Sequence, residues 1–390
     1  MPTERPPSAR ALRRIAEQRR RRRARRRLGW ASAGALAIIA ASVIGSVLWF
    51  TRPPETPPAE TVPSISGDGA SLLLVATDGE QPVGFALFAT HPDVEDRVLL
   101  FPPGLLTVLP GFGSWELDRA DEFGGPGLSA ISLTNLTGAR IDGTVRIPVS
   151  AVAGLLDGSV VDLDEPIFRE EGDDRVVVVA AGSAERDAER IALILGEQGI
   201  GDQLAWLVRQ GSVVELLLDR IAGTAGEVDR LLEVSSGDLT LARDVMAAVA
   251  GDPDTRVTAA QVRPIASLGG SEERYQLAVD DAEAFIADQA AYLGISDGPR
   301  PRVEVLNGTQ RVQVTPPIAA ELVRAGYRIV RTDNADRTDY DVTRIVGHTE
   351  ENQSVALSVF DVLGFGEVRL EVRQPSGIVD ITVIVGDDFQ

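Results

Sequence analysis

The residue types that usually carry catalysis or metal binding are scarce in this sequence. It has no cysteine and only two histidines, His91 and His348, neither with a second histidine at a metal-ligand spacing. It contains neither a G-x-S-x-G nucleophile elbow nor a G-x-x-x-x-G-K phosphate loop. The acidic pairs Asp173-Asp174 and Asp387-Asp388 could hold a divalent cation, but solvated loop ends explain them better. We therefore expect no metal site.

One stretch is typical of a loop but lacks any group that could do chemistry. Residues 99–113, LLFPPGLLTVLPGFG, carry no charge in a chain of which 25% is charged. The stretch is either a structural run or a loop whose chemical groups are missing. The elements around it decide between these alternatives.

The charge divides the chain into a basic tail and an acidic body. Residues 1–27 hold twelve arginines against Glu4 and Glu17, a charge of +10, so the formal charge of −20 leaves −30 for the remainder. Such a body repels phosphates, which argues against a nucleic-acid partner. Residues 28–50 are uncharged and long enough to cross a bilayer as a helix. The preceding arginines predict a cytoplasmic tail (1–27) and an extracytoplasmic body, with an uncleaved anchor favoured over a cleavable signal peptide.

A proline-rich spacer precedes the first folded unit. Five prolines in residues 51–66 predict a stiff linker, which we place at 51–69. Behind it the sequence predicts a mixed-sheet α/β domain over residues 70–295. Strands are expected at 71–76, 84–90, 97–101, 144–149 and 175–180, and helices at 188–195, 213–221, 239–250 and 282–292.

A second break, SDGPRP at 296–301, precedes a smaller α/β unit, residues 302–390. Thr315 is expected to cap its first helix, with Gly326 suited to that helix's C-terminal end. Strands are expected at 303–306, 327–331, 342–346, 367–372 and 380–385, and helices at 316–325 and 354–363.

Four segments of the smaller unit carry a family resemblance: VEVLNGT (303–309), LVRAGYRIV (322–330), TDNADRTDYDVTRIV (332–346) and DITVIVGDDF (380–389). Together they resemble the LytR C-terminal domain, which ends many LytR-CpsA-Psr cell-envelope proteins. None of the four is a catalytic signature. The resemblance implies a docking module for protein or cell wall.

Residues 71–293 look like a LytR-CpsA-Psr domain in the order of their segments. The resemblance rests on Ala76-Thr77-Asp78, HPDVEDRVLL (91–100), Leu109-Pro110-Gly111-Phe112-Gly113 and Gly124-Gly125-Pro126. In this family the domain transfers a polyprenyl-pyrophosphate-linked glycopolymer onto peptidoglycan. Its arginines bind the pyrophosphate, and its aspartates hold Mg²⁺ and assist the attack.

The charged residues that this resemblance implies are mostly missing. The family's S-I-P-R-D falls on residues 101–105, where Gly104 replaces the arginine and Leu105 the aspartate. Its R-S-D falls on residues 81–83, Gln-Pro-Val, and Glu116 stands in place of a cation. Of its paired helix arginines only Arg190 is kept, because the other position is Asp187.

Asp78 and Arg190 are therefore the candidate remnants of a catalytic and ligand-binding site, unless they form a structural ion pair. The loss of several charged residues that would bind the pyrophosphate or Mg²⁺ should leave no useful rate of glycopolymer transfer. We expect a membrane-anchored, extracytoplasmic envelope protein that binds or scaffolds without catalysis and without a cofactor. Its expected partners are the cell membrane and a cell-wall polymer, a polyprenyl lipid or envelope proteins.

Two other functions compete with this hypothesis. The first is an active glycopolymer transferase that uses Mg²⁺ and a non-standard set, Asp78, Asp118, Arg119 and Arg190. The second is a transcriptional attenuator, which the topology opposes because the cytoplasmic tail of 27 residues has no helix-turn-helix pattern. The apolar faces of the helices at 188–195, 213–221 and 239–250 could line a lipid groove, although core packing explains them better.

Overall fold

The fold comes from a computed structural model of the chain, which describes residues 69–389 apart from 173, 202, 266–273, 278–281, 297 and 373–377. Residues 65–390 form one compact unit. The predicted tail, anchor and most of the spacer lie outside the described residues. Within the described part of the chain, no helix is both long and apolar enough to span a bilayer.

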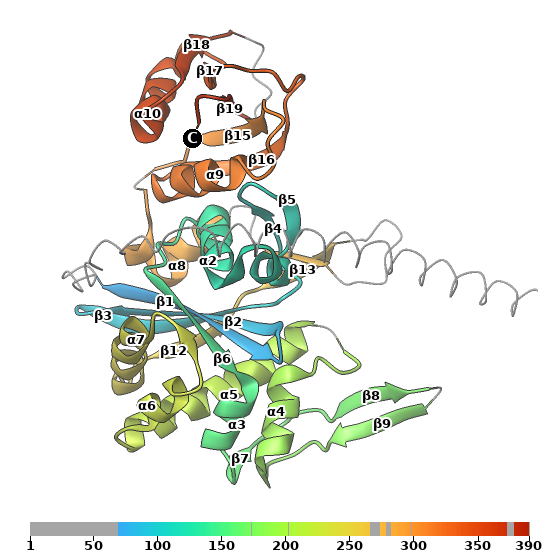
Figure 1. The fold of residues 1–390 in the computed structure, drawn as a ribbon. Helices are drawn as coiled ribbons and strands as arrows, with labels where there is room; N and C mark the ends of the chain where they lie inside the picture. The colour runs from blue at the N-terminus through green and yellow to red at the C-terminus, as the bar shows by residue number, and fades with distance from the viewer. Residues whose placement is uncertain are drawn as a thin grey trace, which may run out of the picture. The chain divides into compact units, whose positions relative to one another are not determined.

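A mixed six-stranded sheet forms the centre of residues 70–295 (Figure 1). In spatial order the strands are β11 (Ser236–Gly237), β6 (Gly143–Pro148), β1 (Ala70–Asp78), β2 (Gln81–His91), β3 (Val94–Phe101) and β12 (Arg256–Ala259). Strands β1, β2 and β3 follow one another along the chain and pair antiparallel, whereas β6 pairs with β1 and β12 pairs with β3 in parallel. The expectation of a mixed-sheet α/β fold is confirmed.

Both faces of this sheet are buried, which explains its uninterrupted apolar strands. Along β1, Leu72 and Leu74 enter one hydrophobic cluster, and Leu73 and Val75 enter another, as alternate side chains of a strand must. Helices α3 (Val149–Leu155), α4 (Ala188–Gly196), α5 (Gln203–Gly223), α6 (Glu227–Leu232) and α7 (Leu239–Gly251) supply the first cluster. Helices α2 (Leu117–Thr137) and α8 (Ala282–Gln289), with the short 3₁₀ turn η1 (Ala291–Leu293), cover the other face.

In the described part of the chain, four two-stranded ribbons accompany the sheet. They are β4 (Leu106–Leu109) with β5 (Gly113–Glu116), β7 (Ser159–Val161) with β10 (Ala184–Arg186), β8 (Ile167–Glu171) with β9 (Asp174–Val179), and β13 (Val262–Ile265) with β14 (Arg274–Leu277). The strand expected at 175–180 is β9. It belongs to one of these hairpins, and its Val176 and Val177 are exposed, so its apolar run does not mark a core strand.

Helix α2 has no counterpart among the expected helices. Gly124 and Gly125 leave helical geometry, with Gly125 at a φ of +70°, and Pro126 follows directly. Glycine and proline inside a segment normally indicate a turn. Residues 124–126 therefore prevented the prediction of a helix that continues beyond a kink. Tertiary contacts hold it in place, because Leu117, Ala130 and Leu133 are buried in the second cluster.

The described residues of 302–389 form a five-stranded mixed sheet with two helices. In spatial order the strands are β16 (Arg328–Asn334), β15 (Arg302–Asn307), β19 (Ile381–Val385), β17 (Arg344–Gly347) and β18 (Glu367–Leu370). Helices α9 (Thr315–Arg324) and α10 (Gln353–Leu363) share a hydrophobic cluster with the sheet. The expected alternation of strands and helices is confirmed.

The capping role expected of Thr315 is wrong. Thr315 lies inside α9, Val314 is the N-cap residue, and no side chain caps this end. The Thr315 hydroxyl instead donates to the carbonyl of Gly111, 3.2 Å away. A contact 204 residues distant in sequence has replaced the local one, and it holds the loop 109–113 against the smaller unit.

Asn135 links α2 to the outer edge of β16. Its Oδ1 accepts from the backbone N–H of Ile329 at 2.7 Å, and its Nδ2 donates to the Ile329 carbonyl at 2.9 Å. Because β16 is an edge strand, its outward backbone groups need partners other than a strand. The amide of Asn135 supplies both partners in a buried position.

We expect Asn135→Ala to lower the free energy of unfolding by roughly 2–4 kcal/mol, because it leaves two buried backbone groups without partners. Denaturant unfolding measures this. Asn334→Ala, at an exposed position on β16, is the control and should change stability by less than about 0.5 kcal/mol. Equal stability of the two variants would contradict this role of Asn135.

Candidate functional site

The loop at 99–113 is part of the interior. Leu105 is completely buried in the second hydrophobic cluster. The N–H of Gly104 donates to Gln203 Oε1 at 3.1 Å, and the Gly104 carbonyl accepts from the N–H of Tyr275 at 3.0 Å. The two positions where the family resemblance places an arginine and an aspartate therefore face protein, and the polar atoms of the Gly104 backbone are already bonded.

The second half of the loop carries an aromatic group. The rings of Phe112 and Phe123 stack with centroids 5.5 Å apart, and Trp115 meets Phe123 edge to face at 5.4 Å. The indole N–H of Trp115 donates to the Phe112 carbonyl at 2.9 Å, which fixes the ring. Gly111 has a φ of +88°, and a Cβ there would lie 2.3 Å from Pro316 Cα, so only glycine fits.

Next to this loop lies a group of charged residues that we call the acidic cluster. Its carboxylates outnumber its guanidinium groups. Arg146 pairs with Asp121 and lies 3.9 Å from Glu80, while Arg274 pairs with Glu116. The members are Glu80, Glu116, Asp118, Asp121 and Glu122 with Arg119, Arg146 and Arg274.

The half-buried Asp118 and the buried Asp121 of the cluster both have raised pKa values. Burial raises the pKa of Asp118 to about 6, against the opposing charge of Arg119, and Glu116 and Glu122 raise it further. Burial also raises the pKa of Asp121, although Arg146 opposes this. One carboxylate oxygen of each has no hydrogen-bond partner. The cluster is therefore an unfavourable place for another anion.

The Asp118 pKa predicts a pH dependence of stability. The folded pKa lies above the unfolded value of about 3.9, so the folded state binds more protons between the two, and ionisation destabilises it as pH rises through about 4 to 6. Asp118→Asn should remove this loss, roughly 1 kcal/mol after solvent screening. Denaturant unfolding at both ends of this pH range measures the loss of stability.

Asp244→Asn is the control, because Asp244 is exposed on α7, and this variant should lose as much stability over the range as the wild type does. If the free energy of unfolding changed equally with pH in the wild type and in Asp118→Asn, the assignment to Asp118 would be refuted.

The structure places Asp78 and Arg190 at opposite ends of α4. Asp78, exposed at the end of β1, lies beside Gly196, the last residue of α4. Arg190 is in the first turn, six residues earlier, or about 9 Å along the helix axis. Its guanidinium pairs with Asp187, which also caps the helix. The ion pair of Arg190 is thus with Asp187 rather than with Asp78.

The apolar faces of three helices are packed in the core. Buried residues of α4, α5 and α7 all belong to the first hydrophobic cluster, for example Ile191, Val213 and Val245. Core packing therefore explains the spacing of these side chains, as expected, and a lipid groove is not needed to account for them.

The histidines and acidic pairs have structural contacts. His348 Nε2 lies 2.8 Å from Thr382 Oγ1, and the His91 ring packs on Tyr292 with centroids 5.0 Å apart. Asp388 accepts from the N–H and hydroxyl of Thr343, whereas Asp173 lies outside the described residues. No group of three or more potential metal ligands occurs within the described ranges.

Arg146 and Asp121 were missed by the sequence analysis. Arg146 lies on β6, in an alternating strand, and reads as an ordinary outward side chain. Asp121 lies on the unrecognised helix α2. The only sign of this ion pair in the sequence was the charge of Arg146 in β6, which pairs with β1 in parallel. That sign did not indicate which carboxylate Arg146 would contact.

Comparison with known proteins assigns the smaller unit. Residues 300–389 match the family model described as LytR cell envelope-related transcriptional attenuator. Residues 300–389 form a LytR C-terminal domain. The resemblance to the LytR C-terminal domain is therefore confirmed for these residues. It relates this part of the chain to cell-envelope proteins. No curated protein matches the chain.

Several solved structures are similar to about three fifths of the chain. TagV of B. subtilis has 13% identity and a TM-score of 0.48, covering 58% of this chain and 98% of its own. A transcriptional regulator from Enterococcus faecalis has 18% identity and a TM-score of 0.48, covering 60% and 92%. A structure of TagT bound to LIIa-WTA has 14% identity and a TM-score of 0.46, covering 61% and 96%. Likeness at this level does not transfer a function.

Proposed function

We propose that the chain is a membrane-anchored, extracytoplasmic cell-envelope protein whose residues 70–295 are a LytR-CpsA-Psr-type domain that binds or scaffolds without catalysing transfer. The LytR C-terminal domain supports the envelope assignment. The arginine-rich tail and uncharged segment 28–50 support a single-pass anchor with a cytoplasmic N-terminus. Partners of the protein would be the membrane and a cell-wall polymer, a polyprenyl lipid or envelope proteins.

One observation carries the non-catalytic part of this proposal. The positions expected to hold the catalytic arginine and aspartate, Gly104 and Leu105, are buried, with Leu105 at 0% exposure. A pyrophosphate needs several cations or a metal to offset its charge. Near this loop Arg146 and Arg274 are instead occupied by carboxylates of the protein.

A specific observation favours the alternative, an active transferase using Asp78, Asp118, Arg119 and Arg190. The pKa of Asp118, raised to about 6, suits a general acid or base near neutral pH. In that function Asp78 is the carboxylate that would hold Mg²⁺, which would offset phosphate charge. Against it, Arg119 pairs with Glu122 at 2.7 Å and Arg190 pairs with Asp187.

Lipid co-purification distinguishes the two functions. Residues 66–390, which fall within the compact unit, are purified from a membrane extract and analysed by mass spectrometry for polyprenyl phosphate or pyrophosphate. Arg190→Ala is compared with Arg243→Ala, whose side chain is equally exposed and also ion-paired. We expect no lipid that depends on Arg190. Lipid lost only in Arg190→Ala, together with Mg²⁺-dependent pyrophosphate release, would establish the transferase.

The predicted topology has a separate test. In intact cells stripped of their wall, an external protease should cleave the body and leave the tail at 1–27 protected. Protection of the body would refute the extracytoplasmic assignment, whatever the lipid experiment gives.

A further inference from the structure

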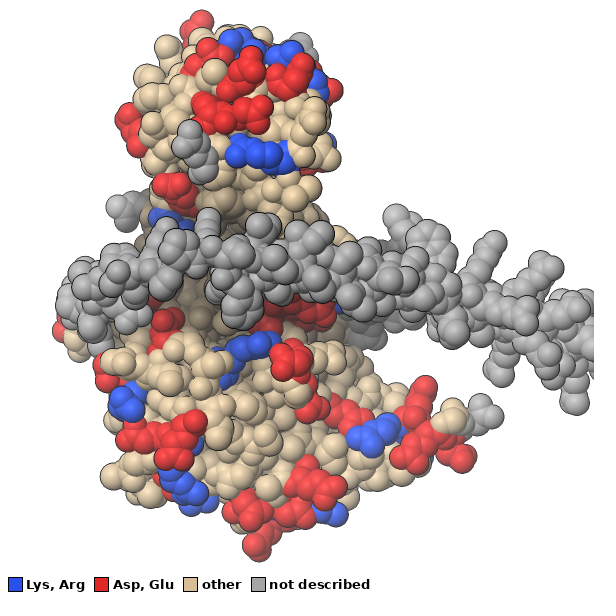
Figure 2. Space-filling view, in the orientation of Figure 1, with Lys and Arg blue, Asp and Glu red and all other residues tan. Residues whose placement is uncertain are grey.

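The ribbon of β8 and β9 projects from the rest of residues 70–295 as an arm (Figure 1). Figure 2 shows this arm standing clear of the surface around it, with carboxylates gathered toward its outer end. Its base is anchored in the first hydrophobic cluster through Ile167 and Val179. Farther out, Val176 and Val177 are 37% and 48% exposed. Because a two-stranded ribbon is marginally stable in water, a further strand would stabilise the arm.

The two edges of the arm differ in what covers them. Successive residue pairs of an antiparallel ribbon alternately bond to each other and turn their N–H and C=O groups outward. The Phe168 carbonyl accepts from the N–H of Ile200 at 2.8 Å, so Phe168 and its partner Val177 form an outward pair. Two residues along, Glu170 and Arg175 form another. Among the described residues, no hydrogen bond reaches the outward backbone groups of Arg175 or Val177.

The sequence of β9 leaves this edge unprotected. Proteins usually protect an edge strand with charges, prolines or a bulge. In β9 the bulge falls at Val178, near the base of the arm, and residues 176–179 are all valine. Arg175 does not shield the edge, because its guanidinium carbon lies 3.7 Å from the centroid of the Phe168 ring, on the side of β8. The outer edge of β9 is therefore open to another strand.

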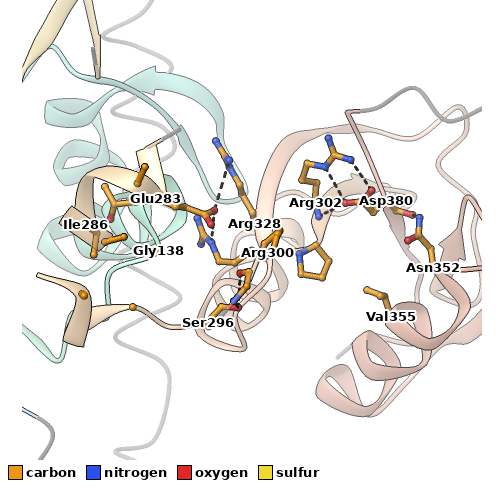
Figure 3. A pocket seen from close by; sticks show the side chains of 18 residues that line it. Gly138, Glu283, Ile286, Ser296, Arg300, Arg302, Arg328, Asn352, Val355 and Asp380 are labelled. Carbon is orange, nitrogen blue, oxygen red and sulfur yellow. Dashed lines mark hydrogen bonds and ion pairs between the residues drawn. The ribbon is translucent and has the colours of Figure 1, made fainter. Parts of the chain in front are cut away.

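The charged pocket beside residues 296–301 is a different case. It has a volume of about 770 Å³. Figure 3 shows that charged side chains in its walls already bond within the chain, since Arg302 binds Asp380 at 2.8 Å. At the edge of β9 the groups without a partner are backbone N–H and C=O groups, for which an added strand is the matching partner.

We propose that β9 pairs with β9 of a second copy of this chain in an antiparallel, two-fold arrangement. With the axis beside Val176, Arg175 of each copy lies opposite Val177 of the other, and the outward groups of both residues are used in hydrogen bonds. Val176 then faces Val176 of the second copy, where two β-branched side chains stabilise the pairing. A register shifted toward the turn would set the two Arg175 side chains opposite each other, which their like charges disfavour.

A second copy suits this edge better than an unrelated strand. A two-fold contact uses the same patch on both partners, and the open edge is short enough that pairing with itself leaves none of its outward groups unbonded. Together the two arms form a four-stranded sheet, which is more stable than either ribbon alone. Because the contact is small, we expect a weak and reversible dimer. The pairing does not depend on the function proposed above.

Disulfide trapping in membranes of cells that express the full-length chain tests the pairing. The chain has no cysteine, so Val176→Cys places a single thiol at the proposed axis. The Cα atoms of such a non-hydrogen-bonded pair are about 4.5 Å apart, a separation that a disulfide can bridge. After mild oxidation with copper phenanthroline, Val176→Cys should give roughly fivefold more disulfide dimer than Val160→Cys, an exposed valine on β7.

Two proline substitutions in the Val176→Cys chain supply matched controls. Val177→Pro removes an outward N–H of β9 and should abolish the dimer, whereas Glu170→Pro removes an outward N–H of β8 and should leave it unchanged. If Val177→Pro does not fold, the comparison with Val160→Cys still decides. Equal cross-linking of Val176→Cys and Val160→Cys, or capture of a different protein by Val176→Cys in place of the dimer, would overturn the proposal.

Discussion

Leu105→Asp should destabilise the protein by more than about 4 kcal/mol instead of restoring a catalytic group. The side chain of Leu105 is completely buried, and its neighbours in the cluster are apolar. A carboxylate there would lose its hydration without gaining a partner. Circular dichroism and denaturant unfolding of the variant measure the effect.

Val94→Asp is the matched control for this substitution. Val94 is 51% exposed on β3, so the same carboxylate remains hydrated and stability should change by less than about 0.5 kcal/mol. A folded Leu105→Asp variant with near-wild-type stability would show that the loop can open toward solvent. That result would remove the main support for a non-catalytic domain.

Arg300→Met should destabilise the protein by about 3–5 kcal/mol, the cost of breaking a buried ion pair by removing one partner. The substitution keeps most of the side-chain volume but leaves Glu283 without its closest cation. It also removes the donors to the carbonyls of Thr134 and Asn135, which end α2. Thermal and denaturant unfolding measure the loss.

Arg324→Met is the control, since Arg324 is exposed in the last turn of α9. Arg300→Lys should be intermediate, because an ammonium group keeps the charge but cannot match the planar fork of a guanidinium. If Arg300→Met were as stable as Arg324→Met, the contact between α2 and the segment before β15 would not be a stabilising one.

Together these predictions separate two roles of α2. Its N-terminal half carries Asp118 and Asp121 of the acidic cluster, and its C-terminal half holds the smaller unit through Asn135 and Arg300. The kink at Gly124 and Gly125 lies between the halves. Losses from Arg300→Met should therefore leave the pH dependence assigned to Asp118 unchanged.

Local pattern was sufficient to predict most of the elements. Strands such as β1 and β6 and helices such as α4 and α7 follow from runs and spacings of apolar residues, because burial on a sheet or helix face leaves a period in the sequence. The same holds for the smaller unit, where strands and helices alternate. The replacement of the family's charged residues by Gly104 and Leu105, and of an arginine by Asp187, is also visible in the sequence alone.

Only the tertiary structure decided what these residues contact. Helix α2 was hidden by its internal glycines and proline, which are compatible with a helix only because packing holds both halves. Thr315 bonds to Gly111 instead of capping its helix, and Asp78 and Arg190 lie at opposite ends of α4. Burial of Leu105 and the pairing of Arg146 with Asp121 arise between segments far apart in the chain. The sequence determined which segments bury a face, because that requirement is local and periodic; the fold decided which charges meet, because those contacts depend on the positions of distant segments in space.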